Sequence, residues 1–317
     1  MLIGIIRAAL WDLSLPQIIK LLAGKPHILY IAATDGHYGG AMAVGDGIDG
    51  VGAEQLHLDI KTPLSEWVKK VKDFQPDIVI GYPSAIKILG ELIEAGEVQT
   101  GISRIISCGE PLGIHMRQYF EKTFTGAKVL NFYGASESLA LGVEENSEDG
   151  MILFDDMNIV EVQDGQMYLT SLYNFAQPLI RYRLTDDIAL CKTDGFTKAA
   201  GLIGRQEDVL WFEHSDGSRD FLHPLSVEGI CVEGLRDYQF RKTGTASFEM
   251  IAEFSESVDT LQAKAEIRLA LDSILREKGL DYVSYEILGT EQIAPDPITG
   301  KKKLILLYEE AKESESA

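Results

Sequence analysis

Residues 104–111 read RIISCGEP, and residues 131–139 read NFYGASESL. In each stretch a β-rich apolar run leads directly into glycine, a carboxylate and small polar residues. Similar apolar runs alternate with amphipathic helical patterns along this part of the chain; the runs are HILYIA (27–32), PDIVIGYP (76–83) and AKVLNF (127–132), and the helical patterns cover 62–74, 84–96 and 113–124. This alternation is typical of a parallel sheet covered by helices. The sequence therefore predicts an α/β fold.

The pattern changes twice further along the chain. From about residue 150 short strands are separated by turn pairs such as Asp164-Gly165, which predicts an antiparallel, β-barrel-like region up to residue 204. After GRQED (204–208) one long helical pattern lies among strands, which predicts a small α+β domain. With 317 residues the chain is long for one domain. We predict a large domain over 1–204 and a small, mobile domain over 205–317, joined by a hinge.

The charge and the cysteines exclude several classes of protein. Asp and Glu outnumber Lys and Arg by 49 to 29, so the net charge of −20 argues against binding to nucleic acid or to an anionic membrane. The three cysteines lie far apart and form no C-x-x-C pair, which favours a reducing compartment. No uncharged apolar run approaches the roughly 20 residues of a membrane span. The N-terminal stretch lacks the basic region of a signal peptide. We expect a cytoplasmic protein.

The two opening stretches also predict a site. Ligands of open parallel sheets bind outside the carboxyl ends of the strands. Glycine lets the backbone approach a flat ring or a phosphate, and Tyr133 offers a face for stacking. Ser136 offers a hydroxyl, and Glu137 offers an oxygen ligand for Mg²⁺. The alternative for each stretch alone is an ordinary turn between a strand and a helix, but two of them at successive strand ends favour a site.

Other motifs allow two interpretations each. The glycine-rich segment 33–52 is either a packing turn or a substrate-pocket wall that carries His37 and Tyr38; it lacks the spacing of a P-loop. PLIRYRLTDD (178–187) is either a surface strand, with Arg181 and Arg183 on one face, or the source of an acid that holds ribose hydroxyls. PDPITGKKKL (295–304) is a turn followed by lysines that are either solvated or functional.

Taken in order, five of these motifs resemble those of the adenylate-forming enzyme superfamily. They are CGEP (108–111), YGASE (133–137), YRLTDD (182–187), GRQED (204–208) and ITGK (298–301). The phrases FQPDIVIGYPS (74–84) and PLIRYR are most similar to phenylacetate-CoA ligases and coenzyme F390 synthetase-like proteins. The resemblance spans roughly residues 25–303. It implies that family's fold, with a parallel-sheet α/β domain, a β-barrel-like subdomain and a small C-terminal α+β domain.

The resemblance also implies an activity. An acid–thiol ligase of this family uses ATP and Mg²⁺ to convert a carboxylic acid, here expected to be aromatic, into an acyl-adenylate, and a thiol such as CoA then displaces AMP. It implies catalytic roles for Lys301, Glu137 and Ser136, with Glu137 as the metal ligand. It implies nucleotide binding by Gly109, Glu110, Pro111, Tyr133, Gly134, Asp186 and Arg205. It implies an acid pocket shaped by His37, Tyr38, Tyr82 and Pro83.

Two departures from the family pattern leave alternatives open. The family's phosphate loop lies before the first predicted strand, and we expect this chain to lack it. The alternatives to a ligase are therefore a non-catalytic remnant that binds a nucleotide or an acid, and an adenylating partner that acylates a protein or feeds a reductase. Thr185 stands where the family has mostly glycine, so the ribose-binding acid is either Asp186 or Asp187, and the spacing from Tyr182 favours Asp186. A homodimer is one of the assemblies left open.

Overall fold

The computed structural model describes most of the chain, in two compact units. The described residues are 6–8, 10–33, 53–146, 150–184, 186, 188–193, 195–200, 209–227, 230–256, 258–293 and 304–306. The first unit comprises Met1–Asp59 and Trp67–Gln206, and the second comprises Ile60–Glu66 and Glu207–Ala317. We had expected the small domain to begin at Arg205 and to contain no earlier segment; its mobility stays a prediction.

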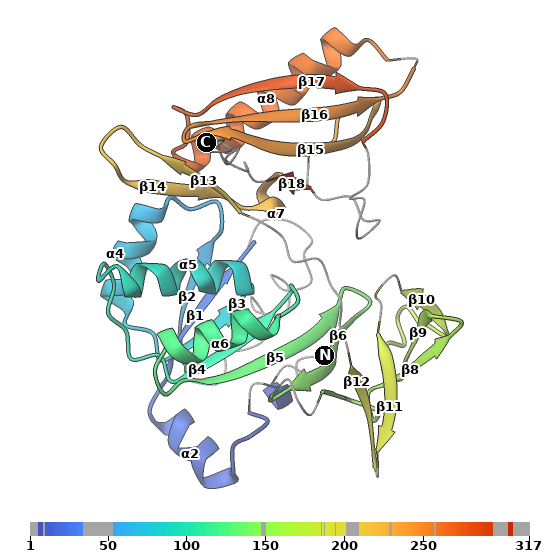
Figure 1. The fold of residues 1–317 in the computed structure, drawn as a ribbon. Coiled ribbons are helices and arrows are strands. Elements are labelled where there is room, and N and C mark those ends of the chain that lie inside the picture. Colours follow the sequence, from blue (N-terminus) through green and yellow to red (C-terminus); the bar gives the residue numbers. More distant parts are fainter. Residues whose placement is uncertain are drawn as a thin grey trace, which may run out of the picture. The chain divides into compact units, whose positions relative to one another are not determined.

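The first half of unit one alternates strands with helices. Its elements are α2 (Leu15–Ala23), β1 (His27–Ala32), β2 (Glu54–Asp59), α4 (Leu64–Phe74), β3 (Ile78–Gly81), α5 (Pro83–Glu94), β4 (Arg104–Cys108), α6 (Ile114–Thr123) and β5 (Lys128–Ala135). Strands β2, β1, β3, β4 and β5 are neighbours in that order, and all of these pairs are parallel. The four predicted strands and the α/β class are thus confirmed, with α5 and α6 in front of the sheet in Figure 1.

The second half of unit one is antiparallel. Its strands are β6 (Ser138–Glu144), β7 (Met151–Leu153), β8 (Asn158–Gln163), β9 (Gln166–Ser171), β10 (Tyr182–Leu184), β11 (Ala189–Thr193) and β12 (Phe196–Ala200). Strands β6, β7, β12 and β11 extend the parallel sheet into one sheet of nine strands, and β8, β9 and β10 form a separate sheet of three. At the predicted turn between β8 and β9, Asp164 and Gly165 both have positive φ, as a tight hairpin requires.

An apolar cluster lies between the nine-stranded and three-stranded sheets. It includes Leu141 from β6, Leu153 from β7, Leu169 from β9 and Leu184 from β10, all of them buried. Tyr133, from the end of β5, belongs to the same cluster. The antiparallel region is therefore packed against the end of the strand that carries the YGASE motif.

Among the described residues, unit two contains a two-stranded sheet, a four-stranded sheet and the longest helix. Its later elements are β13 (Leu210–Glu213), β14 (Arg219–Leu222), α7 (Pro224–Val227), β15 (Leu235–Gly244), β16 (Ser247–Phe254), α8 (Thr260–Lys278), β17 (Ser284–Thr290) and β18 (Ile305–Leu306). Helix α8 buries Ala263, Ile267, Leu271 and Leu275, whose spacing of four residues places them on one face of the helix. That face packs with Phe240, Phe248 and Met250 of the four-stranded sheet β17-β16-β15-β18.

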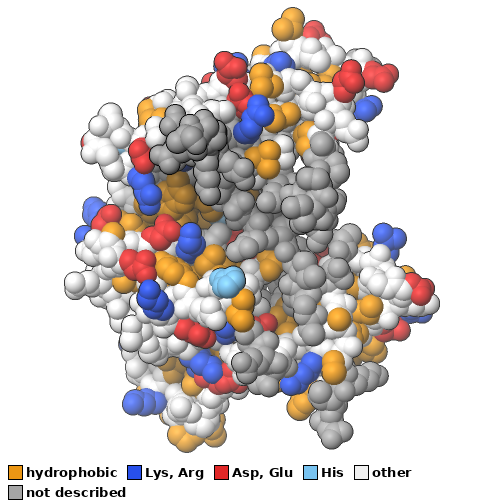
Figure 2. All heavy atoms as spheres, viewed as in Figure 1, with side chains coloured by type: hydrophobic (Ala, Val, Ile, Leu, Met, Phe, Trp, Pro, Cys, Tyr) orange, Lys and Arg blue, Asp and Glu red, His pale blue; other side chains and the backbone are white. Residues whose placement is uncertain are grey.

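The outer surface carries charges of both signs. On the face drawn in Figure 2, acidic and basic side chains are interspersed and do not gather into a basic field. Among the described residues, no helix combines the length and the apolar character that crossing a membrane requires.

Candidate functional site

The end of β3 and the start of α5 carry two of the predicted pocket residues. Tyr82 has an extended backbone and stands at the N-cap of α5, and Pro83 occupies the first turn, where its missing N–H is no disadvantage. The Tyr82 N–H donates to the carbonyl oxygen of Ile31 at the end of β1 (3.2 Å). The Tyr82 side chain is buried, so its ring lies among other groups beneath the strand ends.

The ring of Tyr82 packs on the backbone of the CGEP loop. Gly109 has a φ of +79°, and a Cβ at this position would lie 2.5 Å from Cε1 of Tyr82. Only glycine fits such a close approach in the left-handed region without strain. The connections after β3 and β4 are therefore in direct contact, as two strand ends of one ligand site should be.

A carboxylate joins the same two connections. Glu110 accepts a hydrogen bond from the backbone N–H of Ser84 (3.1 Å) and another from the Ser84 hydroxyl (2.9 Å). Because Ser84 lies in the first turn of α5, Glu110 caps that helix from a different segment of the chain and complements its dipole. The resemblance implied nucleotide binding for Glu110 and no role for Ser84, and no local sequence feature pointed to this contact.

The YGASE motif forms a β-hairpin, not a turn into a helix. Strand β5 continues through Tyr133 to Ala135, and Ala135 pairs with Ser138 of β6, so Ser136 and Glu137 form the turn. The register is irregular between Tyr133 and Ala135, at Gly134. Ser136 is exposed and Glu137 is half-buried. Both side chains therefore lie at the carboxyl end of β5, where the site was predicted, but on a different kind of turn.

Tyr133 and Asp186, both predicted nucleotide-binding residues, lie together. Burial raises the pKa of the Tyr133 phenol above its ordinary value, and the neighbouring carboxylates of Asp186 and Glu137 raise it further. The phenol also donates to the sulfur of Met167 (3.6 Å). Tyr133 therefore remains a protonated hydrogen-bond donor, and its side chain belongs to the apolar cluster described above. Its predicted stacking on adenine stays a prediction.

Strand β10 is shorter than expected. It covers only Tyr182–Leu184, and Arg181 precedes it with a φ of +48°. We predicted that Arg181 and Arg183 share one face of a strand. This is wrong, because Arg181 lies outside β10. Its guanidinium pairs with Glu161 (3.3 Å) and packs over the ring of Tyr168. Arg181 is thus tied to the three-stranded sheet.

Several predicted site residues lie outside the described residues. They are His37, Tyr38, Asp187, Arg205 and Lys301. Of the two candidate ribose-binding acids, the structure describes only Asp186, which lies beside Tyr133.

The donor set is compatible with Mg²⁺ but does not form a metal cage. Within the described part of the chain, no group of three or more His, Cys, Asp or Glu side chains is arranged to hold a metal ion. Mg²⁺ commonly uses one or two carboxylates together with substrate phosphates and water. The half-buried carboxylate of Glu137 in its hairpin turn fits that requirement.

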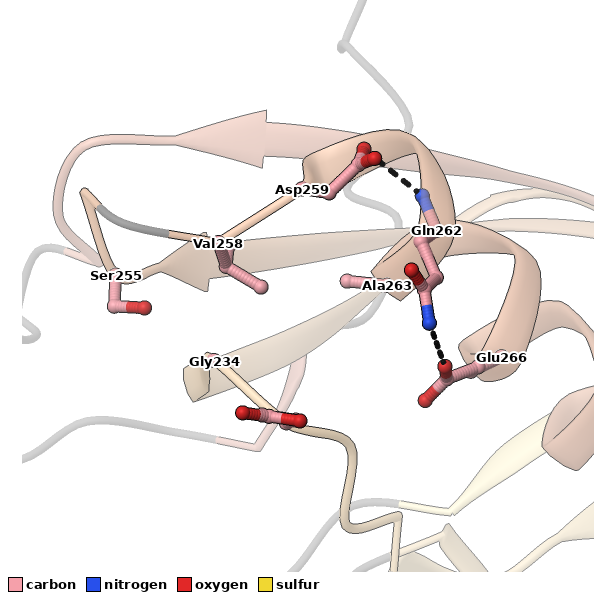
Figure 3. A pocket seen from close by; sticks show the side chains of 8 residues that line it. Gly234, Ser255, Val258, Asp259, Gln262, Ala263 and Glu266 are labelled. Carbon is pink, nitrogen blue, oxygen red and sulfur yellow. Dashed lines mark hydrogen bonds between the residues drawn. The ribbon is translucent and has the colours of Figure 1, made fainter.

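A hollow lies in unit two, at the start of α8 (Figure 3). Asp259 accepts from the backbone N–H groups of Leu261 and Gln262 (3.0 and 3.2 Å), and the Gln262 amide donates to Glu266 (3.0 Å). These bonds are internal to the helix and its cap, so they explain Asp259, Gln262 and Glu266 as parts of an N-terminal capping arrangement.

About half or somewhat more of the chain is similar in sequence to known proteins. No protein-family model matches it. It is 28% identical over 184 residues to the phenylacetate-coenzyme A ligase of Aromatoleum evansii, a match that covers 50% of this chain and 41% of the relative. It is 25% identical over 222 residues to the enzyme of the same name from Escherichia coli K12, over 63% of this chain and 50% of the relative. The matches thus span half or less of these relatives' own length.

The fold has solved counterparts. A structure of 2-hydroxyisobutyryl-CoA ligase in the postadenylation state, in complex with R3-HIB-AMP, matches with a TM-score of 0.50 and 20% identity. The match covers 92% of this chain and 68% of that one. The fold is thus that of the adenylate-forming enzymes, and the sequence is similar to those of phenylacetate-CoA ligases.

Proposed function

We propose that the protein activates a carboxylic acid with ATP and transfers the acyl group to a thiol such as CoA. The observation that supports this most is the meeting of motif residues at three neighbouring strand ends of one sheet. Tyr82 follows β3, Gly109 and Glu110 follow β4, and Tyr133 ends β5 with Asp186 beside it.

In the first step, a carboxylate oxygen attacks the α-phosphorus of ATP and pyrophosphate leaves. In the second step, a thiolate sulfur attacks the acyl carbon and AMP leaves with the electrons of the acyl–oxygen bond. Both steps depend mainly on positioning and on stabilising the charge that develops on phosphate and carbonyl oxygens. Mg²⁺, when bound, would neutralise phosphate charge.

The described residues have distinct roles in this scheme. Asp186 would bind the ribose hydroxyls, and the backbone of Gly109–Pro111 would lie along adenine together with Tyr133 and Gly134. Ser136 would contact phosphate and Glu137 would hold the metal ion, because both occupy the hairpin turn at the end of β5. Tyr82 and Pro83 would border the acid.

Three further assignments concern residues outside the described part. Lys301 would approach the developing charge during adenylation, and a flexible ammonium on a mobile domain suits that task. Arg205 would steady the nucleotide at the hinge. His37 and Tyr38 would complete the acid pocket. An aromatic acid is the expected substrate, since the two relatives named above are phenylacetate-CoA ligases.

Acid-dependent exchange of labelled pyrophosphate into ATP tests the first step. We expect exchange with at least one aromatic acid when the natural full-length protein is assayed against a panel of aromatic and aliphatic acids with Mg²⁺. Thioester formation on addition of CoA then tests the second step. Tight binding of nucleotide with no exchange for any acid would instead support the non-catalytic alternative.

A further inference from the structure

A buried phenol without a partner lies in the middle of β1. Tyr30 is 3% exposed, and within the described chain its hydroxyl makes no hydrogen bond. A buried hydroxyl left unpaired costs about 1–3 kcal/mol, and native proteins satisfy the large majority of such groups. The proposed roles above do not use this hydroxyl.

Tyr30 lies directly beneath the candidate site. It pairs in register with Ile80 of β3, which pairs with Ile106 of β4, and these three side chains belong to one apolar cluster. The cluster is completed at its upper edge by Cys108 and Phe132, which are only partly buried. Cys108 immediately precedes Gly109, and Phe132 immediately precedes Tyr133. The phenol therefore belongs to the same apolar cluster as the first residue of CGEP and the residue that immediately precedes YGASE.

The polar groups of this cluster are neutral. Burial raises the pKa of the Tyr30 phenol, and the neighbouring Cys108 raises it further. Burial, followed by the charge of Glu110, raises the pKa of the Cys108 thiol to about 12. At neutral pH both groups are protonated, so each donates and accepts hydrogen bonds but attracts no ion. His57 of β2 is the register partner of Tyr30, and the centroids of the two rings are 5.1 Å apart.

The distance of Tyr30 from the end of its strand also limits which part of a bound acid could contact its hydroxyl. Tyr30 stands two residues before the end of β1 at Ala32, which is about 7 Å along the strand. That depth is comparable to the length of one substituted aromatic ring. An acid whose carboxylate lies at the strand ends would therefore bring the far side of its ring to the level of Tyr30.

The geometry points to Tyr30 as a specificity-determining residue that hydrogen-bonds a neutral polar substituent, such as a ring hydroxyl, on the acid. This inference rests on the proposed function. The apolar cluster suits the body of the acid, and the single unpartnered hydroxyl suits one polar group at its far end. An acid without that group would leave the phenol unpaired and would bind more weakly.

Calorimetric binding of matched acids tests this inference. The probes are phenylacetate, its three monohydroxylated ring isomers and the three corresponding methyl derivatives. We expect wild type to bind one hydroxylated isomer about fivefold more tightly than phenylacetate, as one net hydrogen bond would give. In Tyr30→Phe that preference should vanish, while phenylacetate affinity stays the same. The free variant should be at least as stable as wild type, because it loses only an unpaired hydroxyl.

Tyr119→Phe is the matched control, since its hydroxyl lies on α6 and faces Glu94 (3.4 Å), away from the proposed site. It should keep the preference of wild type. Equal preferences in wild type and Tyr30→Phe, or no hydroxylated acid favoured by wild type, would overturn the inference. Pyrophosphate exchange with any acid separates the two proposals, because exchange can persist when the preference is absent.

Discussion

Gly109 shows how a single residue shapes the candidate site. Its φ of +79° and the ring of Tyr82, 2.5 Å from a Cβ at this position, each exclude a side chain. We expect Gly109→Ala to lower the free energy of unfolding of unit one by roughly 1–3 kcal/mol, from backbone strain and overpacking. Chemical denaturation measures this. Gly101→Ala is the control, since a Cβ there meets nothing within 4 Å; equal losses in both variants would contradict the prediction.

Glu137 allows a second test at the residue scale. Its carboxylate stands half-buried in the turn between β5 and β6. We expect Glu137→Gln to weaken Mg²⁺-dependent ATP binding at least tenfold, because a neutral amide replaces an ionised metal ligand. The melting temperature should change little, since the amide keeps the shape of the side chain. Unchanged ATP affinity by calorimetry with Mg²⁺ would show that Glu137 is only a turn residue.

The sequence indicated which residues belong to the candidate site, but not which groups those residues contact. The sequence singled out Gly109 as a place where backbone could approach a ligand, whereas the structure shows that the approach is to Tyr82. Likewise Glu110 was expected beside nucleotide, and its carboxylate accepts from Ser84. Both contacts join segments that are far apart along the chain, so local residue patterns carry no information about them.

Helix α5 depends on a cap that another element supplies. The Tyr82 side chain makes no capping hydrogen bond at its N-cap position, and Glu110 accepts from the N–H and hydroxyl of Ser84 instead. We expect Glu110→Ala to destabilise unit one by about 1 kcal/mol, as loss of a helix cap does. Ser84→Ala should cost less, since it removes only the hydroxyl. A double-mutant cycle should show coupling between the two positions. Glu97→Ala, at an exposed glutamate, is the control; additive effects would contradict the cap.

At the scale of elements, hydrophobic periodicity predicted the buried parallel strands but not the edge strand β2. Strands β1, β3, β4 and β5 are nearly continuous in apolar residues, and all four were predicted. Strand β2 was not, because EQLHLD buries only Leu58 and lies at the edge of the sheet. The YGASE motif was expected at a strand exit, but residue type does not distinguish a two-residue hairpin turn from a turn into a helix. The hairpin depends on pairing with β6, which is a long-range property of the sheet.

At the scale of the whole molecule, the chain divides into two units, with a boundary after Gln206; the predicted hinge at GRQED stays a prediction. The assignment of Ile60–Glu66 to unit two had no counterpart in the sequence. The segment hydrogen-bonds to Asp220 of β14 and to Lys278 at the end of α8, which form an ion pair (3.1 Å). Composition cannot reveal which distant charges meet, so this placement of the segment with the C-terminal unit could not be predicted.

The ion pair holds the segment through both partners. Asp220 accepts from the backbone N–H of Leu64 (2.7 Å), and Lys278 donates to the carbonyl oxygen of Thr62. Lys278 is 1% exposed, and its ammonium lies 3.8 Å from the centroid of the Phe221 ring. Breaking such a buried pair by removing one partner leaves an uncompensated charge. The segment should therefore stay with unit two only while both charges are present.

We expect Lys278→Met to lower the free energy of unfolding of unit two by roughly 3–5 kcal/mol, because the Asp220 carboxylate is left buried without its cation. Trypsin should then cleave faster after Lys61, since Thr62 loses its anchor. Adding Asp220→Asn should restore part of the stability, because the side-chain amide oxygen can still accept from Leu64 while the unpaired charge is gone. Lys264→Met, on a half-exposed position of the same helix, controls for the loss of a lysine. If Lys278→Met and Lys264→Met unfold at the same urea concentration, and Lys61 is cleaved at the wild-type rate, the ion pair does not hold the segment.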